Sequence, residues 1–292
     1  MKNFQNILVI TENIDPTQVV LNKALRLAQR AKANLTILVN KKNVATEQHL
    51  QLIYQQQIAN PAMLGVDDFA RPQFDVNIKY STTPFSHQEV LTEISNHPYD
   101  LLIKGIHTAQ PLWGLLRSDN HYLLREGNTN LLLVGDKIWP DNGHILAALE
   151  TEETTDKHLE LNQFMLDESQ YLAQLLSSDV HLINCYQEQP SMSLAEPLFD
   201  EESQEPLQQH WRHLQYSAAN FSVQQDHIHV EAGLPEYVIA HEAEKYQVDI
   251  VVLGAGEHRG LLGLLKGHTS EFIVNTLPCD ALILKANMSN VH

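Results

Sequence analysis

Basic residues are scarce in this chain, and their scarcity excludes two classes of partner. The 19 lysines and arginines face 36 aspartates and glutamates over 292 residues, a formal net charge of −17 with histidine neutral. Such an excess of acid repels phosphate backbones and anionic lipid, so we expect no nucleic-acid partner and no membrane partner. The 16 histidines soften this charge near pH 6, where imidazole titrates.

Cysteines and long apolar runs are also few. Cys185 and Cys279 each lie in or beside an apolar run and form no Cys-x-x-Cys pair, which favours two reduced, buried thiols over a disulfide. No run approaches the roughly 18 apolar residues of a membrane span, and the opening MKNFQNILVI lacks the apolar stretch of a signal peptide. The sequence therefore predicts a cytoplasmic protein.

Motifs of known catalytic chemistry are missing. The chain contains no Gly-x-Ser-x-Gly elbow, no His-Glu-x-x-His and no Gly-Lys-Ser/Thr after a glycine-rich loop. The acidic runs Glu150–Asp156 and Asp200–Glu205 are typical of solvated surface. No residue set demands a reaction, so we predict no catalytic residues.

Histidine pairs raise the alternative of a metal site. His210 and His213 are three residues apart on an expected helix, and His227 and His229 share one face of an expected strand. A zinc site needs three or four converging ligands, which two separate pairs do not supply, so solvent-exposed histidines are the simpler interpretation and no metal site is predicted.

Short apolar runs rich in β-branched residues recur along the chain, separated by helix-like stretches. Continuous apolar strands that alternate with helices predict an α/β fold with parallel sheets covered on both faces. The expected strands are Ile7–Ile10, Leu35–Val39, Val76–Tyr80, Leu101–Lys104, Leu131–Val134, Ile145–Leu149, Val180–Cys185, Ile228–Glu231, Ile250–Leu253 and Ala281–Leu284.

The first five runs repeat as the second five at a nearly constant spacing. Leu131 and Ala281 are 150 positions apart, and YDLLIKG (99–105) reads against VDIVVLG (248–254). Such self-similarity indicates a duplicated domain. We predict two doubly wound, parallel five-stranded domains at residues 1–137 and 143–288, joined by the short linker Gly135–His144 and packed together.

Helices are expected between these strands. Two are expected to begin near Pro84 and Pro235, and a third covers Gln48–Ile58. Apolar stripes at helical spacing mark two more: Val20, Ala24, Leu27, Ala28 and Ala31 in the first half, and Leu207, Trp211, Leu214, Ala218 and Phe221 in the second.

The most informative stretch is Ile250–Leu277, IVVLGAGEHRGLLGLLKGHTSEFIVNTL. A buried strand ends at Gly254, a glycine-containing loop follows, and a helix is expected to start near Gly267. Free N–H groups at a helix N-terminus and the helix dipole both favour an anion there. In the alternative interpretation, Thr269 or Ser270 is simply an N-cap.

On these residues the chain resembles the universal stress protein family, and particularly its tandem, UspE-like members. Their signature is an opening ILVxxD strand and a Gly-x-x-Gly, nine residues, Gly-Ser/Thr/Asn loop before the last helix. Gly254, Gly267 and Thr269 fit this signature, whereas Glu257 replaces its second glycine and Glu150 replaces the aspartate that ends the first strand. The resemblance implies ATP or AMP in a cleft between the first and fourth strands, with Mg²⁺ if the nucleotide is ATP.

Only the second half keeps this signature. At the position of Gly267 the first half has Arg117, and Asp119 stands in place of Thr269, where an acid opposes a phosphate. The resemblance therefore implies a stress-response or regulatory protein with one nucleotide site, made of Leu149, Glu150, Gly254, Gly267, His268, Thr269 and Ser270. A degenerate module that binds a protein partner or an apolar metabolite is the alternative. Slow ATP hydrolysis is the most catalytic activity that we expect.

The resemblance also implies how the halves meet. Family members pair through their last strands, so Leu131–Val134 and Ala281–Leu284 are expected to meet within one chain as a pseudo-dimer. Such pairing covers two apolar edges that are otherwise prone to aggregation. A further homodimer of whole chains is left open.

Overall fold

The computed structural model describes residues 4–11, 19–40, 75–81, 86–106, 119–151, 156–186, 205–219, 221, 223–255 and 276–285. The strands are β1 (Asn6–Thr11), β2 (Asn34–Asn40), β3 (Val76–Ser81), β4 (Leu101–Gly105), β5 (Asn130–Val134), β6 (His144–Ala148), β7 (Asp179–Tyr186), β8 (Ile228–Ala232), β9 (Ile250–Ala255) and β10 (Asp280–Lys285). The helices are α1 (Val19–Ala31), α3 (His87–Asn96), α4 (Asp119–Glu126), α5 (Asp156–Leu176), α6 (Glu205–Ala219) and α7 (Pro235–Lys245), with a short 3₁₀ helix η5 (Gln225–His227).

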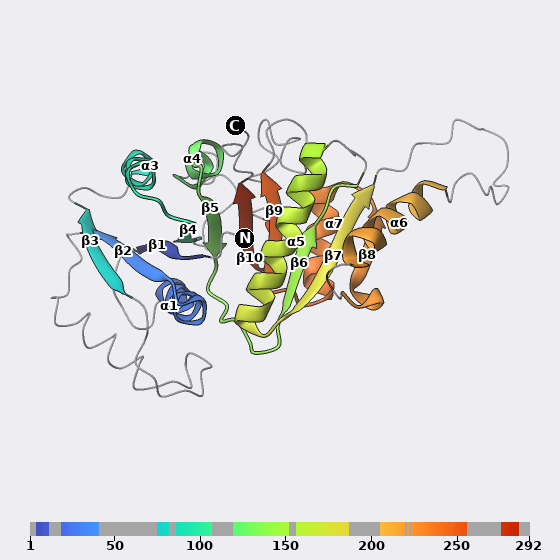
Figure 1. The fold of residues 1–292 in the computed structure, drawn as a ribbon, viewed down its shortest axis with the longest axis horizontal. Helices are drawn as coiled ribbons and strands as arrows, with labels where there is room; N and C mark the ends of the chain where they lie inside the picture. The colour runs from blue at the N-terminus through green and yellow to red at the C-terminus, as the bar shows by residue number, and fades with distance from the viewer. Residues whose placement is uncertain are drawn as a thin grey trace.

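The strands form one sheet of two parallel halves, in the order β3-β2-β1-β4-β5-β10-β9-β6-β7-β8 (Figure 1). Strands within each half are parallel, whereas β5 and β10 pair antiparallel, with Leu132 opposite Leu282. All ten predicted strands are present, and the α/β fold of two parallel five-stranded units is confirmed. The strands that the resemblance pairs are direct neighbours, so the two sheets are continuous with each other.

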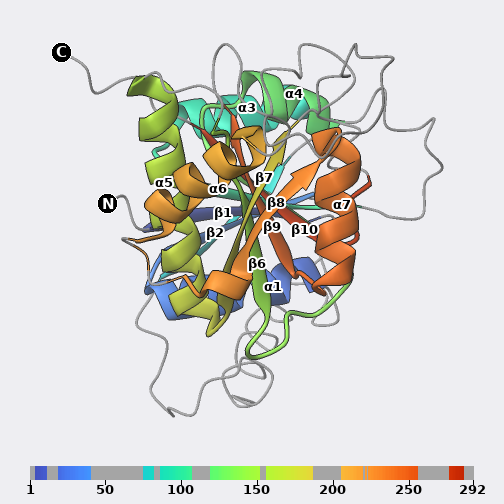
Figure 2. The same ribbon diagram turned by 90° about the vertical axis from the view of Figure 1, so that its right-hand side faces the viewer.

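Alternate residues of each strand point to opposite faces, and helices cover both (Figure 2). On one face, α1, α5 and α6 share a single buried cluster that runs through both halves of the sheet. On the other face, α3 and α4 cover the first half and α7 covers the second, in two separate clusters. This coverage explains why strand residues such as Ile7 and Leu8 are both fully buried.

The linker between the halves is anchored on both sides. Trp139, 4% exposed, donates from Nε1 to Asp280 Oδ2 at 2.8 Å, and Lys23 Nζ of α1 donates to the same oxygen at 2.6 Å. Arg26 Nη1 of α1 donates to the carbonyl oxygen of Trp139 at 2.7 Å. Side chains of the first half therefore hold both the linker and the start of β10.

The predicted helix starts agree in part with the structure. Pro235 is the first residue of α7, as predicted, but α3 begins at His87, where the Ser86 hydroxyl caps it by accepting from the Glu89 N–H at 3.3 Å. The predicted helix at 48–58 lies outside the described residues. Among the described helices, none combines the length and the apolar character that crossing a bilayer requires.

Candidate functional site

In the second half of the sheet, the chain connections that leave β6 and β9 run in opposite directions along the sheet. These strands are parallel neighbours, with Ile145 opposite Ile250, and the chain runs from β6 outward to β7 but from β9 toward β10. In open α/β sheets, ligands bind outside the carboxyl ends of the strands at such a switch point. Leu149 and Glu150 follow β6 directly and Gly254 lies near the end of β9, so three of the predicted site residues reach the same edge of the sheet.

Leu149 contributes to the core at this edge. Its side chain is fully buried, its N–H donates to the Ile183 carbonyl at 2.8 Å, and its carbonyl accepts from Asn184 Nδ2 at 2.9 Å. Both backbone groups are thus already bonded within the protein. Its role here is to fix the path of the chain as it leaves β6.

Glu150 is half-buried and its backbone is held by Asn162 of α5. The Glu150 N–H donates to Asn162 Oδ1 at 3.3 Å, and its carbonyl accepts from Asn162 Nδ2 at 2.6 Å. Burial, and next the charge of Glu150, raise the pKa of the Cys185 thiol to about 12, which places this carboxylate near β7. A carboxylate at a strand end can accept from ribose hydroxyls but opposes a phosphate.

Gly254 is required by helix packing. A Cβ atom at this position would lie 2.6 Å from Met165 Sδ and 3.0 Å from Leu161 Cδ2, both on α5. The close approach of α5 to β9 therefore accounts for this glycine without a ligand. The structure thus gives direct support to a packing role for Gly254, beside the role in the nucleotide loop that the resemblance implies.

Sequence reasoning missed a polar cluster on the α6 side of this edge. Thr151 Oγ1 lies 2.8 Å from His210 Nδ1, and the Thr151 carbonyl lies 3.3 Å from His213 Nδ1. The His210 ring stacks on Tyr186 of β7 at 5.3 Å. The helical spacing of the two histidines was visible in the sequence, but only the fold shows that they position Thr151.

The remaining predicted site residues cannot be placed. Gly267, His268, Thr269 and Ser270 lie outside the described residues, as do Glu257 and His258 of the same stretch. Within the described part of the chain, no group of three or more His, Cys, Asp and Glu side chains is arranged to hold a metal ion.

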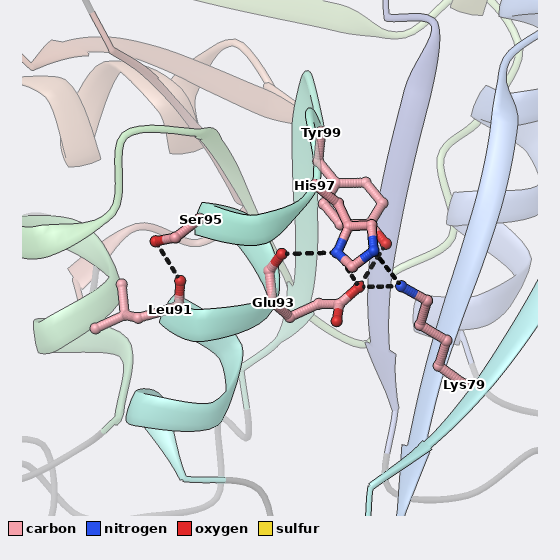
Figure 3. A network of polar contacts seen from close by, with 6 residues as sticks. All are labelled: Lys79, Leu91, Glu93, Ser95, His97 and Tyr99. Atoms are coloured by element: carbon pink, nitrogen blue, oxygen red, sulfur yellow. Dashed lines mark hydrogen bonds and ion pairs between the residues drawn. The ribbon is translucent and has the colours of Figure 1, made fainter.

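A cavity of about 510 Å³ lies elsewhere, at the outer edge of the first half. It is lined by Leu38, Lys79, Tyr80, Glu89, Thr92 and Glu93. Figure 3 shows that the Glu93 carboxylate beside it already has partners: Lys79 Nζ lies 2.5 Å and Tyr99 OH 2.7 Å from Glu93 Oε1, and His97 Nδ1 lies 3.2 Å away. Burial favours a higher pKa for Glu93, but the hydrogen bonds from Lys79 and Tyr99 outweigh it and lower that pKa.

This network, drawn in Figure 3, joins α3 to β3. Its carboxylate is neutralised inside the protein, so the network ties the helix to the edge strand and offers no uncompensated charge to a ligand. The cavity also lies away from the switch point of the first half, which is between β1 and β4. There, a Cβ atom at Gly105 would lie 2.8 Å from Val20 Cγ2, so this glycine too is explained by helix packing.

Comparison with known proteins agrees with this architecture. The model of the universal stress protein family matches residues 143–285. Two curated proteins match nearly the whole chain: the universal stress protein E homolog of Haemophilus influenzae (27% identity; 97% of this chain and 97% of the relative) and universal stress protein E of Escherichia coli K12 (25% identity; 98% and 95%). The similarity to universal stress proteins thus extends over nearly the whole chain, and its second half matches the family model. A solved structure of a functionally unknown protein from Pseudomonas aeruginosa PAO1 has the same fold, with a TM-score of 0.75 at 22% identity over 97% of this chain and 93% of that one.

Proposed function

We propose that the second half of this chain, which matches the universal stress protein family, binds an adenine nucleotide at the β6–β9 switch point and acts in a stress response through that binding. One observation carries the proposal: the fold brings the ends of β6 and β9, with Glu150 and Gly254, to a single edge of the sheet. This edge is where open α/β sheets bind ligands.

The ribose and the phosphates of the nucleotide each have a proposed partner. Glu150, held by Asn162, accepts from the ribose hydroxyls. Backbone N–H groups at Gly267–Ser270, including those of His268 and Thr269, bind the phosphates, and Mg²⁺ accompanies the polyphosphate if the nucleotide is ATP. The support for the phosphate contacts is the sequence of this stretch and the match of residues 143–285 to the family model.

The acidic residues of the region decide how tight such binding is. A carboxylate 4 Å from a phosphate costs about 1–4 kcal/mol in water-like to surface-like surroundings, which weakens binding about ten- to several-hundred-fold. Glu257 stands where the family has a glycine, and Arg259 and Lys266 in the same stretch can offset its charge. AMP, with the smaller charge, loses less from this repulsion than ATP.

Isothermal titration of the full chain with ATP, ADP and AMP tests the proposal. Wild type is expected to release or absorb heat with at least one of them below millimolar concentration. Gly267→Asp places a negative charge at the proposed phosphate position and is expected to weaken binding at least tenfold. Thr92→Ala is the matched control, because the Thr92 hydroxyl donates only to the Gln88 carbonyl on α3 of the first half. No binding by wild type at millimolar concentration removes the proposal.

A second candidate is a module that binds a protein partner or an apolar metabolite. Its support is that Glu150 opposes an anion and that α5 closes the side of Gly254 with Met165 and Leu161. Under this candidate, Gly267→Asp leaves the stress phenotype of cells unchanged. A strong loss of that phenotype with Gly267→Asp counts against the module and for the nucleotide.

We further propose that the halves, residues 1–137 and 143–288, form an intramolecular pseudo-dimer across β5 and β10, in a cytoplasmic protein. Support comes from the antiparallel pairing of these strands and from the free thiols of Cys185 and Cys279. Analytical ultracentrifugation of the full chain distinguishes a monomer of about 33 kDa from a further homodimer.

A further inference from the structure

Three histidines form a hydrogen-bonded array at the amino ends of β6, β7 and β8, opposite the proposed nucleotide edge. His181 lies at its centre: its Nε2 atom is 3.1 Å from His144 Nδ1, and its Nδ1 atom is 3.1 Å from His229 Nε2. His144, His181 and His229, called the histidine array below, thus connect three neighbouring strands side by side.

Two further rings cover the array. His227 of η5 stacks on His181 with ring centroids 3.9 Å apart, and Tyr246, just after α7, stacks on His229 at 4.2 Å. His181 and His229 are only 3% and 6% exposed. The array therefore joins β7 to the edge strand β8, to η5 and to the end of α7.

The number of protons decides whether the array holds together. Each gap between two ring nitrogens needs one N–H, and three uncharged rings carry three N–H groups, enough to fill both gaps. The two ring nitrogens outside these gaps are His144 Nε2 and His229 Nδ1. A fourth proton fits only if both of these outer nitrogens carry one. A fifth places two N–H groups in the same gap, where they repel, so the array accepts one positive charge at most.

The surroundings also oppose a charge on the array. Burial, and then the nearby His227, His144 and His229, lower the pKa of His181 to about 3. Burial also lowers the pKa of His229, with Lys245 and His227 adding to the effect and Glu242 and Asp226 opposing it.

The carboxylates that face the array are already hydrogen-bonded to other groups or lie outside its buried centre. Lys245 Nζ binds both oxygens of Glu242, at 3.1 and 2.9 Å, so this buried carboxylate is paired. Asp249 Oδ2, beside His144, accepts from the backbone N–H of that residue at 2.9 Å. Asp226 belongs to η5, none of whose residues is buried.

We propose that the histidine array is an acid-sensitive device, which holds β8, η5 and α7 on β7 while its rings are uncharged and releases this edge of the second half when they take up protons. The edge is suited to release, because β8 is the last of the described strands and, among them, pairs only with β7. The device lies at the opposite end of the strands from Glu150, so it does not depend on the nucleotide proposal.

The direction of the effect follows from proton binding. The closed state binds fewer protons than the open state below about pH 6.5, the ordinary value for imidazole, so closure is complete above that pH and is lost as the pH falls. For each ring that must stay uncharged in the closed state, the equilibrium constant for opening rises by up to about tenfold with each pH unit of acidification below about pH 6.5. For two such rings, it rises by up to about a hundredfold per unit.

Amide hydrogen exchange on the full chain, expressed as protection factors between pH 7.5 and 5.5, tests the proposal. When the pH falls from 7.5 to 5.5, the protection factors of the β8 and α7 amides are expected to fall at least tenfold more than those of β1 and β2. The β1 and β2 amides serve as the internal reference. Equal loss in both halves, or no loss, overturns the proposal.

His181→Phe keeps a ring in the stack but cannot take up a proton, and the buried His229 remains. The acid-induced loss of β8 and α7 protection is therefore expected to be smaller than in wild type, by up to about tenfold per pH unit. His241→Gln on α7 is the matched control, since the His241 side chain is 75% exposed, and it is expected to keep the wild-type response. A wild-type response in His181→Phe overturns the proposal.

A measurement on wild type covers the case in which His181→Phe does not fold. Imidazole ¹⁵N shifts are expected to report uncharged His181 and His229 rings in the closed state at pH 5.5. Positive charge on both His181 and His229 in a chain that keeps full protection of β8 overturns the proposal.

Discussion

At the scale of single residues, the chain keeps several ionisable groups in its interior. Glu168 of α5 is 4% exposed, and among the described residues its Oε2 atom has no hydrogen-bond partner. Burial, and next the charge of Asp167, raise its pKa to about 7. No sequence pattern pointed to this buried carboxyl, because an isolated glutamate in a helix is ordinarily solvated.

We expect Glu168→Gln to stabilise the protein at pH 8 and to change little near pH 4.5. The folded state holds a proton on Glu168 that the unfolded state has lost above about pH 4.5, so this carboxyl reduces stability as the pH rises from about 4.5 to about 7. The gain at pH 8 is about 1–3 kcal/mol. Urea unfolding at both pH values measures it, with the exposed Glu160→Gln on the same helix as the control. A loss of stability at pH 8 contradicts the prediction.

At the scale of elements, the strands were the most predictable part of the fold. Their short apolar, β-branched runs are local signals, and all ten correspond to strands. Helix starts were less predictable: Pro235 marks α7, whereas the Ser86 cap, not Pro84, starts α3. The longest of the described helices, α5, had no local signal that singled it out. The acidic run before it was interpreted as surface, and its contact with Gly254 joins distant parts of the chain.

The packing of α5 on β9 predicts the effect of a side chain at Gly254. Gly254→Ala brings a methyl group against Met165 and Leu161, and we expect a loss of about 1–3 kcal/mol in the free energy of unfolding. Gly135→Ala is the control, because a Cβ atom there meets only Asp280 Oδ1, at an ordinary 3.8 Å, and its effect is expected within about 0.5 kcal/mol. Equal losses in the two variants, measured by chemical unfolding, contradict the prediction.

At the scale of the whole molecule, the halves are joined by more than their shared strand pair. Asp280, at the start of β10, accepts from the Gly135 N–H at 2.9 Å, from Trp139 Nε1 and from Lys23 Nζ. Burial raises the pKa of Asp280 and lowers that of Lys23, while their mutual attraction acts against both shifts. The buried ion pair thus connects α1 of the first half, the linker and the second half.

Asp280→Asn is expected to destabilise the chain by about 3–5 kcal/mol, because it leaves the buried Lys23 ammonium without its counter-charge. The double variant Lys23→Met, Asp280→Asn removes that lone charge and is expected to recover part of the loss. Thermal unfolding followed by circular dichroism compares the three proteins. A double variant less stable than Asp280→Asn would show that the lone charge is not the cause.

The sequence by itself determined the strands, their order in two copies and the absence of a recognisable catalytic motif, because these depend on local patterns. The predicted site was only partly accessible to such reasoning: Leu149, Glu150 and Gly254 reach one edge, while Gly267–Ser270 remain a prediction. Tertiary structure alone decided which side chains meet. His144, His181 and His229 lie on separate strands, and Lys23 and Asp280 lie in different halves, so their contacts exist only once the strands have paired and the helices have packed.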